Sequence, residues 1–175
     1  MKPRRFSWLL LLALFLGACG DSDEEEVVVP PKWQVEALAY ATAPVLPGAL
    51  PVIPQAAQPG YTWLLLQLEV ENLTSADTRL IWFTDTFRYV TANGDTYSLK
   101  LNLPAIPGYL PTSYHPHQVQ SGFLVFEVPE DSDFAAGTLS FTSSGQPTLE
   151  FPLRGLPSFT PPPLPEPPVP VPPEP

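Results

Sequence analysis

The sequence has a single cysteine, Cys19, among its 175 residues, and only two histidines. One thiol excludes an intramolecular disulfide and any metal site built from several thiolates. The chain also contains no Gly-x-Ser-x-Gly elbow and no glycine-rich phosphate-binding loop. Ser, His and Asp residues are present, but any exported chain with many serines contains them, so their presence does not indicate a catalytic triad. We therefore expect no catalytic residues, no metal and no cofactor, and we expect that the protein is not an enzyme.

Basic residues are also scarce. Once the first eighteen residues are removed, five Lys or Arg side chains stand against eighteen Asp or Glu side chains, a net charge of −13. A surface with this charge repels anionic lipid headgroups and the phosphate backbone of nucleic acids. Nucleic acid is therefore excluded as a partner.

No apolar run is long enough to span a membrane as a mature helix. The run from Phe6 to Leu16 has about half of the roughly 20 residues that a spanning helix needs. It follows a basic start and precedes small residues, which is the three-part form of a secretory signal peptide. We therefore interpret the first residues as an export signal and not as an anchor.

The end of this signal, Leu16-Gly17-Ala18-Cys19, resembles the lipobox of bacterial lipoprotein precursors. The resemblance implies cleavage before Cys19, a thioether-linked diacylglycerol on its thiol and an amide-linked fatty acid. An ordinary secretory signal with an incidental cysteine is the alternative. Two or more acyl chains hold a protein stably on a membrane, so we expect a lipid anchor on the extracytoplasmic side. Gly20 stands where Asp is the usual inner-membrane retention signal, which favours the outer membrane if the envelope has two, although Asp21 weakens this inference.

Proline and acidic residues mark the borders of the folded part. We expect a signal peptide over residues 1–18, a lipidated acidic tether over 19–32, one folded domain over 33–155 and a proline-rich tail over 156–175. Eleven of the residues 157–175 are proline, so the tail should form a polyproline helix outside the core. It can serve as a polyproline ligand, as a spacer, or as a terminus without a partner.

The strongest strand signal extends from Gly60 to Asn72. Leu64, Leu66, Leu68 and Val70 share one parity, whereas the other parity carries Gln67, Glu69 and Glu71. This period of two is typical of a strand with one buried and one solvated face. Trp63 and Leu65 interrupt the polar parity, so we expect that end of the strand to be covered on both faces. We predict that this is the central strand of a β domain.

Several shorter strands are predicted around it. They begin at Trp33, cover residues 79–83, 87–91, 96–101 and 119–128, and include Leu139 with Phe141 and Leu149 with Leu153. Asn93-Gly94 lies between the third and fourth of these segments and predicts a hairpin with a type I′ turn. Two proline-rich loops, residues 44–59 and 102–118, interrupt the series, and the first should pack on the domain through its apolar residues. About seven short strands joined by turns favour an antiparallel β-sandwich.

Three stretches together resemble a known domain. They are Gly60 with the alternating residues up to Asn72, Phe87-x-Tyr89 with Gly94 and Tyr97, and the segment Gly122-Phe-Leu-Val-Phe-Glu-Val-Pro129. Their order and spacing resemble the telokin-like, immunoglobulin-like domain of unknown function found in bacterial lipoproteins, over about residues 33–153. The resemblance implies an immunoglobulin-like sandwich that is exported, non-catalytic and without an agreed ligand. The chain departs from the family pattern in its long loop Leu103–Gln118 and in its proline tail.

The long loop carries the candidate site residues. Tyr109, Tyr114, His115 and His117 form a possible binding loop, because loops on a rigid scaffold are the variable, functional parts of a domain. Packing of the two tyrosines against the edge of the domain is the alternative. The histidines could share a metal, but a closed zinc site takes four ligands and the sequence has no other His or Cys beyond Cys19. Solvated loop histidines are the simpler interpretation.

Three functions stay open at this point. The first is a lipid-anchored accessory module that binds another component of the cell envelope, with the membrane contacted through the lipid on Cys19. The second is a metal- or small-ligand-binding lipoprotein that uses His115-Pro116-His117. The third is a purely structural envelope tether.

Overall fold

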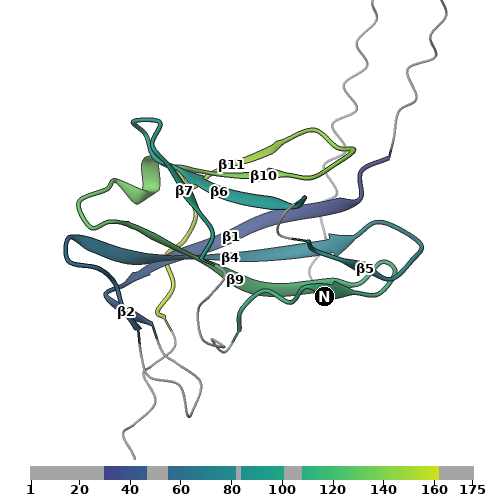
Figure 1. Ribbon diagram of the computed structural model, residues 1–175, viewed down its shortest axis with the longest axis horizontal. Coiled ribbons are helices and arrows are strands. Elements are labelled where there is room, and N and C mark those ends of the chain that lie inside the picture. Colours follow the sequence, from purple (N-terminus) through teal and green to yellow (C-terminus); the bar gives the residue numbers. More distant parts are fainter. Residues whose placement is uncertain (1–29, 47–54, 82–83, 101–107, 162–175) are drawn as a thin grey trace, which may run out of the picture.

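The computed structural model describes residues 30–46, 55–81, 84–100 and 108–161, so the signal peptide, Cys19 and most of the tail lie outside the described residues. Two antiparallel sheets face each other (Figure 1). The three-stranded sheet has the order β1-β4-β9, with β1 at Trp33–Ala43, β4 at Tyr61–Asn72 and β9 at Val119–Pro129. The expectation of an all-β sandwich is confirmed.

The four-stranded sheet has the order β11-β10-β6-β7, with β11 at Leu149–Pro152, β10 at Thr138–Thr142, β6 at Thr86–Val90 and β7 at Thr96–Ser98. Two short ribbons complete the fold, β2 at Val45–Leu46 with β3 at Gln55–Ala56, and β5 at Thr78–Arg79 with β8 at Ser113–Tyr114. A 3-10 turn at Phe134–Ala136 precedes β10. Within the part of the chain that the structure describes, no helix is long and apolar enough to cross a membrane.

Strand β4 is the centre of the three-stranded sheet, as the alternation predicted. Leu64, Leu66, Leu68 and Val70 are at most 1% exposed and point toward the other sheet. Each of these buried side chains contributes roughly 1.5–3 kcal/mol to folding. Aromatic rings fill the core between the sheets. The ring centroids of Phe87 and Phe141, on neighbouring strands of one sheet, are 4.5 Å apart, and those of Tyr89 and Phe126, on opposite sheets, are 6.4 Å apart.

Strand β1 changes face along its length. Its pairing with β4 shifts register between Ala37 and Ala39, which marks a β-bulge. Before the bulge, Trp33 and Val35 belong to the core between the sheets; after it, Ala41 and Ala43 belong to a second apolar cluster. A single extra residue therefore lets one strand serve both faces of the sheet.

The predicted hairpin is present, but its turn differs from the prediction. Gly94 has a positive φ of 90°, and its N–H donates to the backbone carbonyl of Thr91. The N–H of Thr91 donates to the backbone carbonyl of Asp95. Asn93 is not in the positive-φ region, because His117 is the only such residue among the described non-glycine residues. The type I′ prediction is therefore wrong. The loop has three residues, a length at which a type I turn followed by one left-handed glycine is the usual solution.

Two other boundaries differ from the expectation. Strand β5 ends at Arg79, after which Leu80 is buried; Trp82 and Phe83, which were expected to continue it, lie outside the described residues. The long loop contains β8, which pairs with β5.

The tail expectation is wrong for the first residues after Gly155. Ser158 forms a parallel bridge with Tyr40, supported by hydrogen bonds from Tyr40 N–H to the Pro157 carbonyl (3.1 Å) and from Phe159 N–H to the Tyr40 carbonyl (3.0 Å). Pro157 and Phe159 take part in this pairing because β1 is an edge strand with free backbone groups on that side. The chain leaves the core only after Phe159.

Candidate binding face

The structure buries Tyr114 in the core. Its side chain is 2% exposed, and its ring meets the Trp33 ring edge to face at 5.2 Å. Burial raises the pKa of the phenol, and the hydroxyl has no hydrogen-bond partner among the described residues. This geometry favours the packing alternative for Tyr114 over a role on a binding surface.

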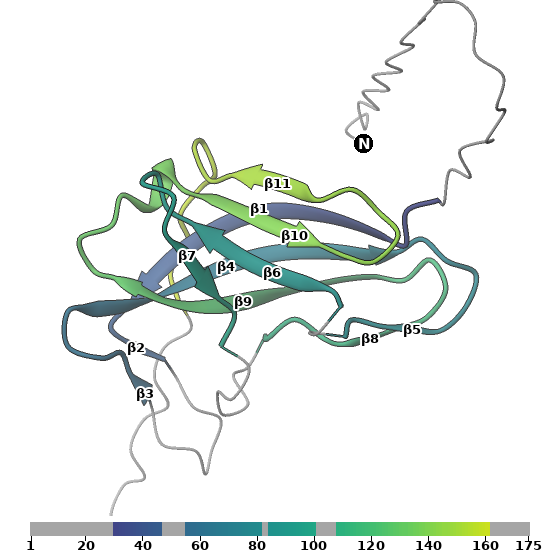
Figure 2. The same cartoon turned by 45° about the horizontal axis from the view of Figure 1, so that its top comes forward.

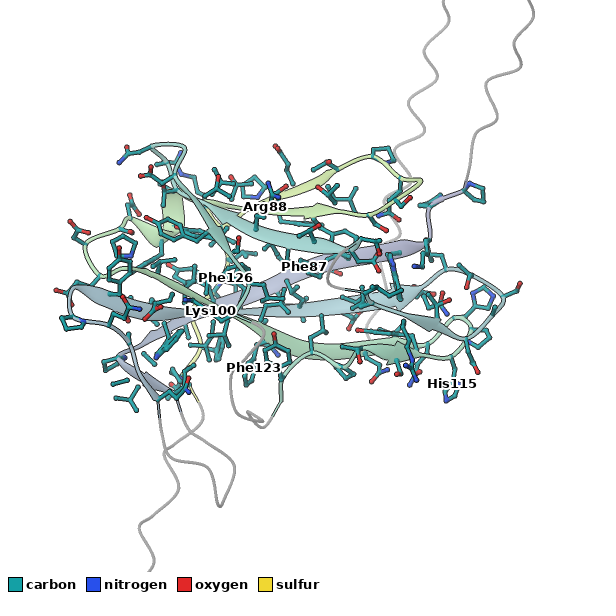
Figure 3. All side chains as sticks on the ribbon, in the orientation of Figure 1. Phe87, Arg88, Lys100, His115, Phe123 and Phe126 are labelled. Carbon is teal, nitrogen blue, oxygen red and sulfur yellow. The ribbon has the colours of Figure 1, made fainter. Side chains whose placement is uncertain are left out.

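The two histidines lie on the surface at one end of the sandwich, the end labelled by His115 in Figure 3. His115 Nδ1 lies 2.9 Å from Asp77 Oδ1, and both side chains are more than three-quarters exposed. His117 takes a φ of 55°, and its N–H donates to the Asn72 carbonyl. In the described ranges, no three His, Cys, Asp or Glu side chains lie together in a way that suits a metal ion. The pair is an exposed, salt-screened contact of low energy.

Tyr109 lies on a different part of the molecule. It forms a parallel bridge with Phe123 on the outer edge of β9, and its hydroxyl donates to the Lys100 carbonyl at 3.4 Å. Burial raises its pKa to about 12. The four predicted loop residues therefore do not form one site: Tyr109 is separated from Tyr114 and from the histidines.

Tyr109 belongs to a second apolar cluster, on the face of the three-stranded sheet that points away from the core. We call it the outer cluster. Its buried members are Ala41, Ala43, Leu46, Trp63, Leu65, Phe123 and Val125, with Ala57, Tyr109 and Phe159 packed against them. The interrupted parity at Trp63 and Leu65 predicted this second covered face. Sequence reasoning missed Phe159, which no strand period marks.

Three proline-rich segments that are far apart in the sequence meet at the outer cluster. The first loop contributes Leu46 and Ala57, the second contributes Tyr109, and the tail contributes Phe159. The Phe159 ring stacks near the Phe123 ring, with centroids 6.4 Å apart and planes 29° apart. Ribbon β2–β3 lies under this end of the sheet in Figure 2. The face is thus assembled by the proline-rich parts of the chain.

The buried carboxylate of Glu127 contacts residues at the borders of both proline-rich loops, Gln58 in the first and Lys100 just before the second. Glu127 on β9 is 9% exposed and accepts from the Gln58 N–H at 2.9 Å through Oε1. Its Oε2 lies 2.9 Å from Lys100 Nζ, at the start of the second loop (Figure 3). Burial raises the pKa of Glu127, but the hydrogen bonds from Lys100 and Gln58 and the Lys100 charge outweigh it and hold the pKa below its ordinary value.

A second buried carboxylate lies at the other end, where the chain enters β1. Asp85 is 1% exposed; it accepts from Ser143 Oγ at 2.5 Å and from Ile81 N–H at 2.8 Å, and Lys32 Nζ lies 3.7 Å away. Both carboxylate oxygens of Asp85 are therefore paired with groups of the fold. Nearby, Gln146 Oε1 accepts from the backbone N–H groups of Lys32 and Trp33, each at 3.0 Å. The tether therefore joins the domain at a fixed point.

These observations define the chain as an all-β sandwich whose three-stranded sheet is covered by apolar side chains on both faces. No family model matches the sequence, and no curated protein matches it.

Among solved structures, the chain is similar to a conserved hypothetical protein of Bacillus anthracis (16% identity, 69% of this chain and 88% of that chain, TM-score 0.47). It is also similar to an uncharacterized β-sandwich protein of Clostridium difficile (13% identity, 70% and 86%, TM-score 0.45). A Bacillus subtilis protein provisionally named a lipoprotein is similar at 15% identity over 68% of this chain and 35% of that one, with a TM-score of 0.48. This chain thus spans about a third of that protein. These likenesses are too distant to carry an argument about activity.

Proposed function

We propose that this protein is an exported lipoprotein that is anchored through Cys19 on the extracytoplasmic side of the membrane, the outer membrane where the envelope has two. In this proposal it is not an enzyme but a binding module for another protein of the cell envelope. The lipobox-like Leu16-Gly17-Ala18-Cys19 and the preceding apolar run support the anchor. The resemblance to the telokin-like domain of bacterial lipoproteins fits the same proposal.

The observation that carries the binding role is the convergence of three proline-rich segments on the outer cluster. Proline lacks a backbone N–H, so each proline in these segments offers an acceptor without a donor. The rings of Tyr109 and Phe159 stay partly exposed at the border of the outer cluster, where a partner can contact them. Their roots are fixed by Glu127 and by the Phe159–Phe123 stack. Loops held on a rigid scaffold lose little entropy on binding, which favours recognition.

Photo-crosslinking in intact cells tests this role. A benzophenone amino acid at Ala56, which is exposed on β3 beside the outer cluster, should give a discrete adduct with a second protein. The matched control is the same probe at Arg88, which is exposed on β6 of the opposite sheet (Figure 3) and should give no such adduct. Equal adducts from both positions, or none from either, would contradict the proposal.

The anchor and the absence of catalysis need separate tests. In cells fed a labelled fatty acid, the wild-type protein should take up the label and the Cys19→Ala variant should not. A wild-type protein without label, or a variant labelled equally, would contradict lipidation of Cys19. Turnover of a defined substrate by the purified Cys19→Ala protein would refute the non-catalytic assignment.

The histidine alternative is less favoured by the geometry. His115 is paired with Asp77, and no third ligand from the described residues approaches them. Unchanged metal retention after replacement of both histidines would dispose of this alternative.

A further inference from the structure

We propose that a cleft on the β5–β8 ribbon binds a small zwitterionic group, with the anionic oxygens of the ligand on Arg79 and Ser113 and its ammonium on Asp77. The cleft has a volume of about 370 Å³, which lies in the usual range of small-molecule sites. It lies at the end of the sandwich labelled by His115 in Figure 3 and shares no residue with the outer cluster. The inference therefore goes beyond the proposed binding of an envelope protein.

The register of the ribbon places four polar side chains on one face. Arg79 pairs with Ser113 across the ribbon, and residues opposite each other share a face. Because successive residues alternate and the neighbouring Tyr114 is buried in the core, Arg79 and Ser113 point outward, and both are exposed. Asp77, two residues before Arg79, and His115, two residues after Ser113, line the same cleft.

The groups that would contact a ligand have no partner within the fold. Asp77 Oδ1 lies 2.9 Å from His115 Nδ1 on the facing segment, so this carboxylate does not pair with Arg79. Among the described residues, no carboxylate pairs with the Arg79 guanidinium, and neither Asp77 Oδ2 nor the Ser113 hydroxyl has a hydrogen-bond partner. The cleft therefore offers two donor groups at one end and an acceptor at the other.

A buried side chain holds the shape of the cleft. Asn72 at the end of β4 is 0% exposed, and its Nδ2 donates to the backbone carbonyls of Ala76 at 2.8 Å and of His115 at 3.0 Å. The His117 N–H donates to the Asn72 carbonyl, and His117 takes a φ of 55°. A positive φ in a residue other than glycine is uncommon, and such conformations cluster at functional sites. Asn72 thus joins the two segments that carry Asp77 and His115.

The balance of charge in the cleft defines the class of ligand. With His115 neutral, Arg79 contributes one positive charge and Asp77 one negative charge, on residues about 7 Å apart along an extended chain. Asp77 would repel a simple anion, and Arg79 would repel a simple cation. A group that carries both charges is attracted at both ends. Lipid headgroups of the phosphoethanolamine type and free amino acids share this chemistry.

An NMR titration of the full mature chain, purified as the Cys19→Ser variant, tests the site at about pH 8, where an imidazole is neutral. Glycerophosphoethanolamine and alanine are the zwitterionic probes, and glycerophosphoglycerol is the anion without an ammonium. We expect a zwitterion to shift the backbone amides of residues 77–79 and 113–115 with a dissociation constant of about a millimolar, because exposed charge pairs are weak. The anion should bind at least about fivefold more weakly. Tighter binding of glycerophosphoethanolamine assigns the site to a lipid headgroup, and tighter binding of alanine assigns it to a free amino acid.

Two variants test the separate ends of the cleft. Arg79→Gln should weaken binding of the zwitterion about fivefold, whereas the matched control Arg88→Gln, exposed on β6 of the opposite sheet, should leave it unchanged. Asp77→Asn should weaken binding of the zwitterion and strengthen binding of the anion, because it removes the charge that attracts the first and repels the second.

Three results would overturn the inference. They are the absence of a shift with all three probes, equal binding of the anion and the zwitterions, and an Arg79→Gln variant that binds as tightly as Arg88→Gln. An Asp77→Asn variant that changes both kinds of probe in the same direction would overturn it as well. The titration involves no protein partner, so its outcome is independent of the crosslink from Ala56.

Discussion

Gly122 is a position at which a single added methyl group should destabilise the fold. It lies on β9 opposite Leu68, and the segment from Gly108 to Leu110 passes directly over it. A Cβ at Gly122 would stand 2.5 Å from Leu110 Cα and 2.8 Å from Leu110 N, and both are backbone atoms. The Gly122→Ala variant must therefore displace the segment, since no side-chain rotation relieves the contact.

The cost follows from what the segment contributes. Leu110 N–H donates to the Phe123 carbonyl at 3.1 Å, Phe123 N–H donates to the Gly108 carbonyl at 2.9 Å, and Leu110 is 1% exposed in the core. Two weakened hydrogen bonds cost roughly 0.5–1.5 kcal/mol each, and overpacking adds roughly 1–3 kcal/mol. Gly→Ala returns roughly 0.4–1 kcal/mol through the unfolded chain. We expect Gly122→Ala to lower the free energy of unfolding by about 2–4 kcal/mol.

Urea denaturation of the mature chain, purified without lipid as the Cys19→Ser variant, measures this loss. The matched control is Ser121→Ala at the adjacent, exposed position of β9, which should change the unfolding free energy by less than about 0.5 kcal/mol. A Gly122→Ala variant as stable as this control would refute the described contact between the loop and β9.

Three further predictions concern the buried polar groups and the tail. Tyr114→Phe should leave the unfolding free energy unchanged or raise it by up to about 1 kcal/mol in urea denaturation, because it removes an unpartnered buried hydroxyl; a clear loss would show that the hydroxyl is hydrogen-bonded. Glu127→Gln should cost about 1–2 kcal/mol at pH 7. Because the folded pKa of Glu127 is lowered, its contribution is complete above its ordinary value of 4.5 and is lost as the pH falls through the folded pKa, so the difference from wild type should shrink in acid melts; a constant difference would contradict the Lys100 pairing. Truncation after Pro161 should leave the melting temperature unchanged, whereas truncation after Gly155 should lower it measurably; equal melting temperatures would show that residues 156–161 do not stabilise the domain.

Much of the sandwich could be predicted because its strands follow a simple period. The leucines of β4 alternate over the whole strand, and the second parity fails only where Trp63 and Leu65 lie under the outer cluster. A strand with one buried face shows alternating apolar and polar residues, and a strand with two buried faces shows a continuous apolar run, so both can be predicted from the sequence. The bulge near Leu38 leaves none, because an extra residue in an alanine-rich strand changes the facing of side chains without changing composition.

The candidate binding face was harder to predict from the sequence, because its contacts leave no periodic pattern. Tyr109 and Tyr114 look alike in a proline-rich loop, yet Tyr114 pairs with Trp33 in the core while Tyr109 lies on the outer cluster. Phe159 follows two residues after a proline and looked like part of the tail. Such contacts are set by tertiary packing and not by local pattern, so only the fold shows that three distant segments share one surface.

The parallel pairing of Ser158 with Tyr40 has a mechanical consequence, because β1 begins at Trp33, where the chain enters the sandwich. If the lipid holds one end and a partner pulls on the other, tension enters the sandwich at Trp33 and leaves through the parallel pairing of Ser158 with Tyr40. The load then acts along β1 and crosses to Ser158 through the two backbone hydrogen bonds of Tyr40, which are sheared together and do not open one after another. The domain would act as a stiff link between bilayer and partner.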